Sequence, residues 1–306
     1  MNRTVLPYLS AALCLVAIPA LAGSSYQGQF QKTLQLSGAA NLEVFTHSGD
    51  VTIHSGSAGT MTIVGRIHVG DHWLAGNRKS DVSQLESNPP IHQEGNRVKV
   101  DYVPFRDISI DYDITLPADT AVRAESGSGN LTIDGLQSGV DGRTGSGDVR
   151  LDHISGNIRV QSGSGNITGE RLAGPLDVNA SSGDIRLEET AQGDVRAHTG
   201  SGNIEIKGIE GSVRAEAGSG NVEVQGKPSS SWYVRTGSGN AELALAGDSG
   251  FDLDVSTGSG TINVDHPVTT TVQGRIESPQ KSITGKVRGG GPQVEVHTGS
   301  GDIRIR

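Results

Sequence analysis

The feature that most constrains this fold is a motif of Gly-Ser-Gly followed by Asn, Asp or Thr, recurring over residues 127–261. Its serines are separated by 18, 18, 18, 19, 18, 19 and 21 residues. A fixed period of this length is typical of stacked repeats, in which each unit buries its apolar side chains only against its neighbours. The serines are Ser128, Ser146, Ser164, Ser182, Ser201, Ser219, Ser238 and Ser259.

Each repeat holds two segments in which apolar and polar residues alternate. Ile158, Val160 and Ser162 precede one motif, and Ile185 and Leu187 follow another. Alternation with a period of two is typical of a β-strand with one buried face. We therefore predict an all-β fold with two strands in each unit of about 18 residues.

The motif itself has the composition of a tight corner between two strands. Glycine adopts positive φ without steric cost, and Asn and Asp tolerate left-handed geometry and bond nearby backbone amides. We expect a structural role for the glycines and for the Asn or Asp that follows them. These predicted corner residues are Gly127, Gly129, Asn130, Gly145, Gly147, Asp148, Gly163, Gly165, Asn166, Gly183, Asp184, Gly200, Gly202 and Asn203.

Two architectures fit this pattern, a hairpin meander and a parallel β-solenoid. The residue five positions before each corner serine alternates in charge over five repeats, and in a parallel stack these residues are neighbours about 4.8 Å apart. In a meander they would lie two strands apart, so the alternation favours the solenoid, about 35 Å long for eight rungs. The column is Arg123, Asp141, Arg159, Asp177, Arg196 and Arg214.

The first 22 residues have the form of a secretory signal peptide. Arg3 precedes the apolar run 9–18, and Ala20-Leu21-Ala22 is a small-x-small cleavage signature. We expect export to the periplasm or cell surface of a bacterium, with the mature chain starting near Gly23. Cys14 is the only cysteine, so the mature chain would have no thiol and no disulfide.

The charge balance excludes some classes of partner. Removal of Arg3 leaves 24 basic and 34 acidic side chains, a net charge of 24 − 34 = −10. That charge repels phosphate backbones, so we predict no nucleic-acid partner. After the signal peptide no apolar run is long enough to span a bilayer, so we do not expect an integral membrane protein.

The repeat is interrupted at both ends. Residues 23–117 read as an N-terminal β-rich capping segment with a short helix near 71–87, and residues 118–264 as the solenoid repeats. Residues 265–306 read as a C-terminal excursion and a last rung. Atypical end units are expected, because an open strand edge invites aggregation.

We predict no catalytic residue, metal site or cofactor. The serines recur too regularly to be nucleophiles, since a catalytic serine is singular and has a base beside it. Calcium β-rolls place one residue between the second glycine and the acid, whereas here the two are adjacent and the acid is often Asn. A glycan-cleaving enzyme would need carboxyl groups that converge from one face.

The best candidates for binding are residues that depart from the regular pattern. Glu205, Glu223 and Glu242 fall in one outward column, where three adjacent like charges cost energy unless Lys207 or Arg214 lies nearby. Trp73 is a fourth candidate, within the irregular N-terminal segment. We interpret these residues as a contact for a cation or a partner.

Three stretches are similar to a known family: the strand 113–117, the corner unit 122–131, and the closing unit 298–303. Over roughly residues 40–306 the chain resembles the bacterial domain-of-unknown-function family named putative adhesins. That resemblance implies an exported β-solenoid without a catalytic motif.

Our leading hypothesis is a non-catalytic adhesin or cell-envelope binding and structural module. Its partner would be a cell-surface molecule, a glycan, an envelope protein or a second copy of the chain. One alternative is a periplasmic scaffold or envelope-stress component that binds a protein. Another is a carbohydrate-active enzyme built on a β-helix.

Overall fold

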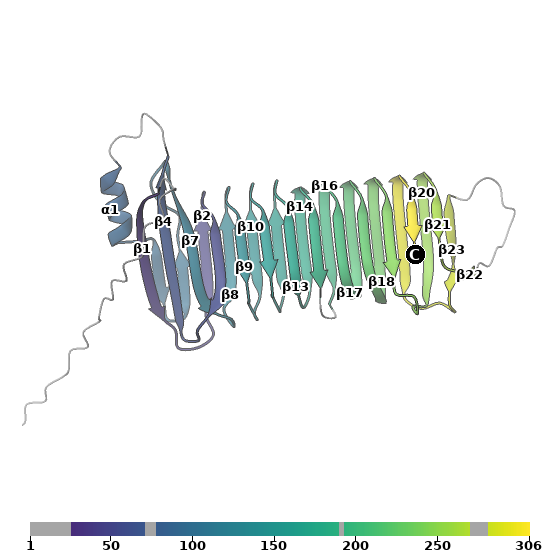
Figure 1. Ribbon diagram of the computed structural model, residues 1–306, viewed down its shortest axis with the longest axis horizontal. Helices are drawn as coiled ribbons and strands as arrows, with labels where there is room; N and C mark the ends of the chain where they lie inside the picture. The colour runs from purple at the N-terminus through teal and green to yellow at the C-terminus, as the bar shows by residue number, and fades with distance from the viewer. Residues whose placement is uncertain (1–25, 71–77, 190–192, 270–280) are drawn as a thin grey trace, which may run out of the picture.

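The computed structural model describes residues 26–70, 78–189, 193–269 and 281–306. The expected signal peptide, Trp73 and the first part of the expected helical stretch lie outside these residues. The described chain forms one long coil of β-strands, with the short helix α1 (Lys79–Ser87) at its N-terminal end (Figure 1). The fold is therefore an all-β, mostly parallel β-solenoid, as the repeat predicts. No helix in the described ranges is long and apolar enough to cross a membrane.

Strands that lead into the corners form one side of the solenoid, which we call the entry face. The column of alternating charges lies on this face. Its residues are aligned in parallel register, with Asp141 between Arg123 and Arg159. In spatial order its strands are β6 (Arg97–Val100), β2 (Asn41–Thr46), β8 (Ala121–Ser126), β10 (Val140–Thr144), β12 (Ile158–Ser162), β14 (Leu176–Ser182), β16 (Val195–Ser201), the second halves of β17 (Ile204–Ser219) and β18 (Val222–Ser238), β24 (Gln293–Ser300) and β20 (Phe251–Ser259).

Strands that leave the corners form the opposite side, the exit face. They also pair in parallel, so the described coil extends for roughly 48 Å at about 4.8 Å per rung. In spatial order these strands are β7 (Ile108–Pro117), β3 (Val51–Gly56), β9 (Leu131–Asp134), β11 (Val149–Asp152), β13 (Ile167–Leu172), β15 (Ile185–Glu189), the first halves of β17 and β18, β19 (Ala241–Leu245), β25 (Ile303–Ile305) and β21 (Ile262–Val264).

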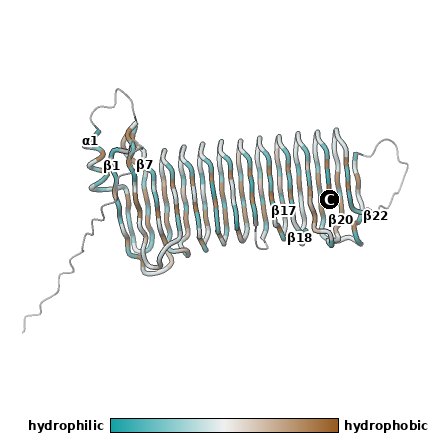
Figure 2. Tube along the Cα trace, in the orientation of Figure 1, coloured by the Kyte–Doolittle hydropathy of each residue, from teal (hydrophilic) through white to brown (hydrophobic). Residues whose placement is uncertain are grey.

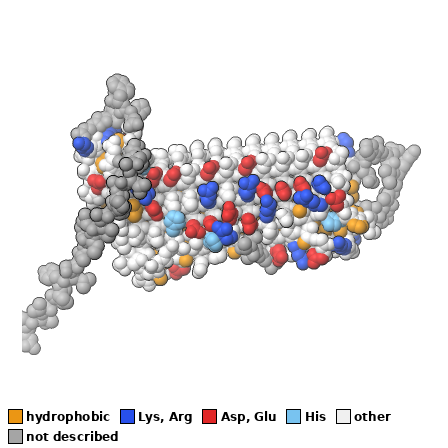
Figure 3. Space-filling view, viewed as in Figure 1, with side chains coloured by type: hydrophobic (Ala, Val, Ile, Leu, Met, Phe, Trp, Pro, Cys, Tyr) orange, Lys and Arg blue, Asp and Glu red, His pale blue; other side chains and the backbone are white. Residues whose placement is uncertain are grey.

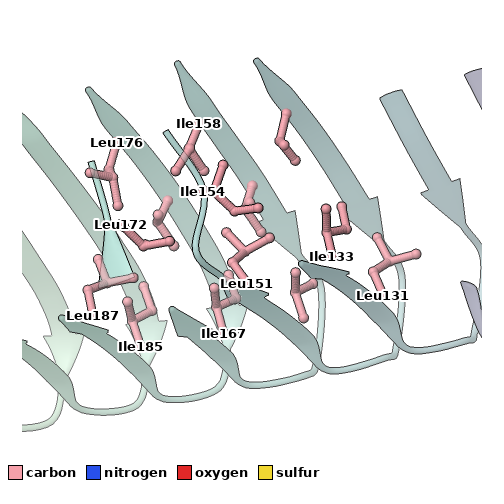
Figure 4. Close-up of a cluster of buried hydrophobic side chains, with 14 of the residues drawn as sticks. Leu131, Ile133, Leu151, Ile154, Ile158, Ile167, Leu172, Leu176, Ile185 and Leu187 are labelled. Atoms are coloured by element: carbon pink, nitrogen blue, oxygen red, sulfur yellow. The ribbon is translucent and has the colours of Figure 1, made fainter. Parts of the chain in front are cut away.

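The core is a thin layer of aliphatic side chains between the two faces. In one rung Ile158 and Val160 point inward from the entry face, and Ile167 and Leu172 from the two ends of β13 on the exit face. All four are fully buried. Figure 4 shows such side chains converging from successive rungs, and Figure 2 shows the alternation of apolar and polar residues along each strand. Each rung contributes few large side chains, so stacking supplies the burial that a single rung lacks.

The corner glycines are required for a different reason from the expected one. Gly163 does not have positive φ. A Cβ at Gly163 would instead lie 2.3 Å from the carbonyl oxygen of Gly145 in the preceding rung. Left-handed geometry applies only to the second glycine of some corners, such as Gly202 at φ +153°. Close approach of successive rungs therefore explains the first glycine of the motif.

The residue after the glycines links each rung to the next. The backbone N–H of Asn166 donates to Asp148 Oδ1 (2.7 Å), and the N–H of Asp184 donates to Asn166 Oδ1 (2.9 Å). The same bond recurs from Asp50 at one end to Thr261 at the other. Asn and Asp serve equally, because both offer Oδ1 as an acceptor.

The N-terminal segment extends the coil and then covers it. Strands β2 and β3 form a regular rung that packs against β8 and β9, and β6 and β7 lie on its other side. The antiparallel strands β4 (Thr60–Val69), β1 (Tyr26–Gln35) and β5 (Ile91–Glu94) complete this end. Helix α1 packs on β1, where Val82 and Leu85 are buried.

At the C-terminal end, the spatial order of the rungs differs from the chain order. The rung of β24 and β25 lies between β18–β19 and β20–β21, so residues 293–306 enter the stack one rung before its end. The outermost position belongs to β20 with the antiparallel strand β23 (Ser282–Val287), which also pairs with β22 (Val268–Thr269). Residues 293–306 thus form a regular rung, which is the last in the chain but not the last in the stack.

Candidate binding surfaces

The predicted glutamate row lies on the exit face. Glu205 pairs in register with Glu223, and Glu223 with Glu242, so the three carboxylates occupy neighbouring strands β17, β18 and β19. Figure 3 shows this face, with acidic and basic side chains in rows along the solenoid. Parallel pairing of outward positions is the reason that residues 18 and 19 positions apart in sequence meet here.

Cations flank the row at both ends. Arg186 Nε lies 2.6 Å from Glu205 Oε2, and Lys207 Nζ also contacts Glu205. Bonds from Lys207 and Arg186 lower the pKa of Glu205 below its ordinary value.

At the other end Arg306 lies 3.1 Å from Glu242. Among the described residues no ion pair within 4.0 Å involves Glu223 itself. Of the two cations considered for relief of this repulsion, Lys207 contacts Glu205, whereas Arg214 belongs to the entry face, where it pairs with Glu216 and stacks on Tyr233.

A second charged group on the exit face was not singled out from the sequence. Asp134 and Asp152 are neighbours in register, and His153 Nδ1 lies 3.7 and 3.3 Å from their carboxylates. Arg171 donates to His153 Nδ1 (3.2 Å) and also contacts Asp152. Burial raises the pKa of Asp152 and is the largest single influence, but the bonds and positive charge of Arg171 and His153 together outweigh it, so the net shift of this pKa is downward. The spacing suits metal ligands, yet Arg171 already provides a positive charge at Asp152.

An aromatic cluster lies at the N-terminal end of the entry face. The rings of His47 and Tyr102 stack with centroids 4.3 Å apart and an interplanar angle of 22°, and Phe45 lies 5.8 Å from Tyr102. Lys99 Nζ and the Arg123 guanidinium lie 5.5 and 5.9 Å from the centre of the Phe45 ring. Tyr102 is 44% exposed and is the only exposed large apolar side chain in the described ranges.

The stack at His47 exists because the repeat is broken there. His47 occupies the position that glycine holds in the next corner, where a Cβ on Gly127 would lie 2.4 Å from the His47 carbonyl oxygen. The first corner instead has the irregular segment 101–107 beside it, which leaves room for a ring. The sequence offers one signal for this cluster, the replacement of the motif's first glycine by histidine in His47-Ser-Gly-Asp50.

Comparison with known proteins identifies the family. Residues 95–306 match the family described as Toastrack DUF4097. A "putative adhesin" structure from Bacteroides fragilis is 13% identical with a TM-score of 0.44, over 92% of this chain and 99% of that one. A "putative cell adhesion protein" structure from Clostridium sporogenes is 14% identical with a TM-score of 0.29, over 90% of this chain and 97% of that one. None of the curated proteins searched matches the chain.

Proposed function

Since the chain belongs to the Toastrack DUF4097 family and folds as a parallel β-solenoid, we propose that it is an exported, non-catalytic adhesin or binding module of the bacterial cell envelope. Its partner is a cell-surface molecule, a glycan or an envelope protein. Contact is made through the exit face, centred on Glu205, Glu223 and Glu242. The solenoid acts as a stiff support that holds these groups at fixed spacing.

The proposed contact depends on the position of Glu223 in the middle of the glutamate row. It lies between two other carboxylates in register, about 4.8 Å from each. Arg186 and Lys207 are engaged with Glu205, and Arg306 with Glu242. A cationic group on a partner would therefore find its best electrostatic position above Glu223. Such complementarity contributes mainly to the association rate and to specificity.

The carboxyl groups with a shifted pKa lack the property that an acid catalyst needs. A glycoside hydrolase needs a carboxylic acid whose pKa is raised, so that it can donate a proton near neutral pH. In the described part of the chain, the carboxyl groups with shifted pKa values are all shifted downward, by hydrogen bonds and ion pairs: Asp152, Asp194, Glu205 and Asp302.

Export is tested by expressing the full chain with a C-terminal tag in a bacterium with two membranes. The periplasmic, outer-membrane and medium fractions are then separated, and the intact mass of the tagged protein is measured. We expect a mature chain that begins at Gly23 and lies outside the cytoplasm. An uncleaved chain confined to the cytoplasm would refute the export part of the proposal.

Binding is tested with labelled mature protein added to intact bacterial cells and to isolated envelopes. Glu223→Lys places a cation between Glu205 and Glu242, so the fold should be retained while the charge of the three positions falls from −3 to −1. Glu295→Lys on the entry face makes the same change in charge and is the matched control. We expect at least a tenfold loss of retention for Glu223→Lys only. Equal retention of both variants, or no retention of the wild type, would contradict the proposal.

A further inference from the structure

The geometry points to a carbohydrate-binding site at the N-terminal end of the entry face, built on Tyr102. We propose that the exposed ring of Tyr102 stacks on a sugar ring of a cell-surface glycan, while polar groups of the adjoining hollow bond its hydroxyls. The inference deepens the proposed binding role by naming a ligand class, and it concerns a surface separate from the glutamate row.

The three aromatic rings of the cluster differ in how they are used within the protein. Both nearby cations lie against Phe45, at 5.5 and 5.9 Å, so the protein already uses that ring internally. His47 stacks on one face of Tyr102 and fixes its orientation. Tyr102 nevertheless remains 44% exposed. An aromatic ring that is oriented by a neighbour and still in contact with water can serve as a stacking platform for a ligand.

A hollow in the surface lies beside the Tyr102 ring. It has a volume of about 900 Å³ and is lined by His47, Ser48, Gly70 and residues 102–109. That volume lies within the range of roughly 300–1,000 Å³ typical of sites for small ligands. Ser48 and Ser109 supply hydroxyl groups, and Arg106 and Asp107 supply a donor and an acceptor with exposed side chains. The Tyr102 ring therefore gives the hollow an apolar side, and the polar residues that line it can both donate and accept hydrogen bonds.

This combination favours a sugar over other ligands. The C–H groups of a sugar ring carry partial positive charge and fit the negative face of an aromatic ring, and its hydroxyls need both donors and acceptors. A quaternary ammonium ligand would meet Lys99 and Arg123 close to the cluster. A folded protein partner buries about 800 Å² on each side, far more than one exposed tyrosine provides.

The test uses an immobilised array of oligosaccharides built from hexoses, N-acetylhexosamines and uronic acids, with apolar peptides on the same slide. The probe is the labelled mature chain. Tyr102→Ala removes the platform, and Tyr102→Phe keeps the ring while removing only the hydroxyl. Tyr233→Ala is the matched control, because Tyr233 lies further along the same face with Arg214 stacked on it. Thermal unfolding of each variant establishes that the fold is retained.

We expect the wild type to bind a subset of the sugars, Tyr102→Phe and Tyr233→Ala to bind within threefold of it, and Tyr102→Ala to lose at least tenfold. No sugar binding by the wild type, binding to peptides alone, or undiminished sugar binding by Tyr102→Ala would each overturn the inference. The proposed function fails separately: retention on cells that depends on Glu223 but not on Tyr102 would leave that function standing without a glycan site here.

Discussion

Replacement of Gly163 by alanine should destabilise the solenoid through a backbone collision. The new Cβ would lie 2.3 Å from the Gly145 carbonyl oxygen, so the two rungs must separate by about 1 Å to reach van der Waals contact. The rungs are held there by the N–H of Gly163 donating to Thr144 (3.0 Å) and the N–H of Ser164 donating to Gly145 (3.1 Å). Weakening two such bonds costs about 1 kcal/mol each, and overpacking adds roughly 1–2 kcal/mol.

The expected loss is therefore about 3–4 kcal/mol, or a decrease in Tm of roughly 6–16 °C for a large domain. Circular dichroism melts of the mature chain measure it, with Gly247→Ala as the matched control, because a Cβ there meets nothing within 4 Å. Arg159→Ala removes an exposed ion pair with Asp177 (3.4 Å) and should cost less than about 1 kcal/mol. Three variants with the same Tm would refute the reasoning from close approach.

Three further predictions test other parts of the structure. Trp232→Phe should cost about 1–3 kcal/mol, because Trp232 is 1% exposed and its Nε1–H donates to the Gly211 carbonyl at 2.9 Å; denaturant unfolding measures it. Hydrogen bonds from the backbone N–H and the hydroxyl of Thr261 lower the pKa of Asp302 in the folded state. The ionised carboxylate therefore stabilises the fold above the ordinary pKa of 3.8, and this stabilisation is lost as the pH falls through the folded pKa. Thermal melts of Asp302→Asn between pH 2 and 7 should lack this pH-dependent contribution to stability. Deletion of residues 293–306 removes the rung between β18 and β20, so residues 246–269 should become protease-sensitive while the rungs up to β18 stay protected. Equal protection of both parts in limited proteolysis would contradict the observed rung order.

Local sequence pattern was sufficient to predict the strands and their parallel pairing. Period-two alternation marks the inward positions, and the alternating charges at Arg123, Asp141 and Arg159 could be neighbours only in a parallel stack. The glutamate row followed from the same register. These features are predictable because each depends on a fixed spacing of 18 or 19 residues along the chain.

The reason for the corner glycines could not be obtained from the sequence alone. Positive φ and close approach both favour glycine, and only the distance between rungs separates the two explanations. At Gly163 only the close approach to Gly145 requires glycine, whereas at Gly202 both positive φ and close approach require it. The aromatic cluster was missed for a related reason. The stacking of Tyr102 on His47 joins two irregular segments, and no repeat relates their positions.

The placement of residues 293–306 is the part of the fold that no pattern in the sequence specifies. Their Thr-Gly-Ser-Gly-Asp unit is a regular rung and could stack at any compatible end. In the structure the N–H of Asp302 donates to Asn240 and the N–H of Thr261 donates to Asp302, so this rung continues the side-chain ladder on both sides. Among the described residues, the rung of β20 and β21 pairs with the preceding part of the solenoid through β24 and β25, at the end of the chain. Because these contacts join residues about 40–60 positions apart, closing this end costs more chain entropy than stacking a rung 18 or 19 residues away.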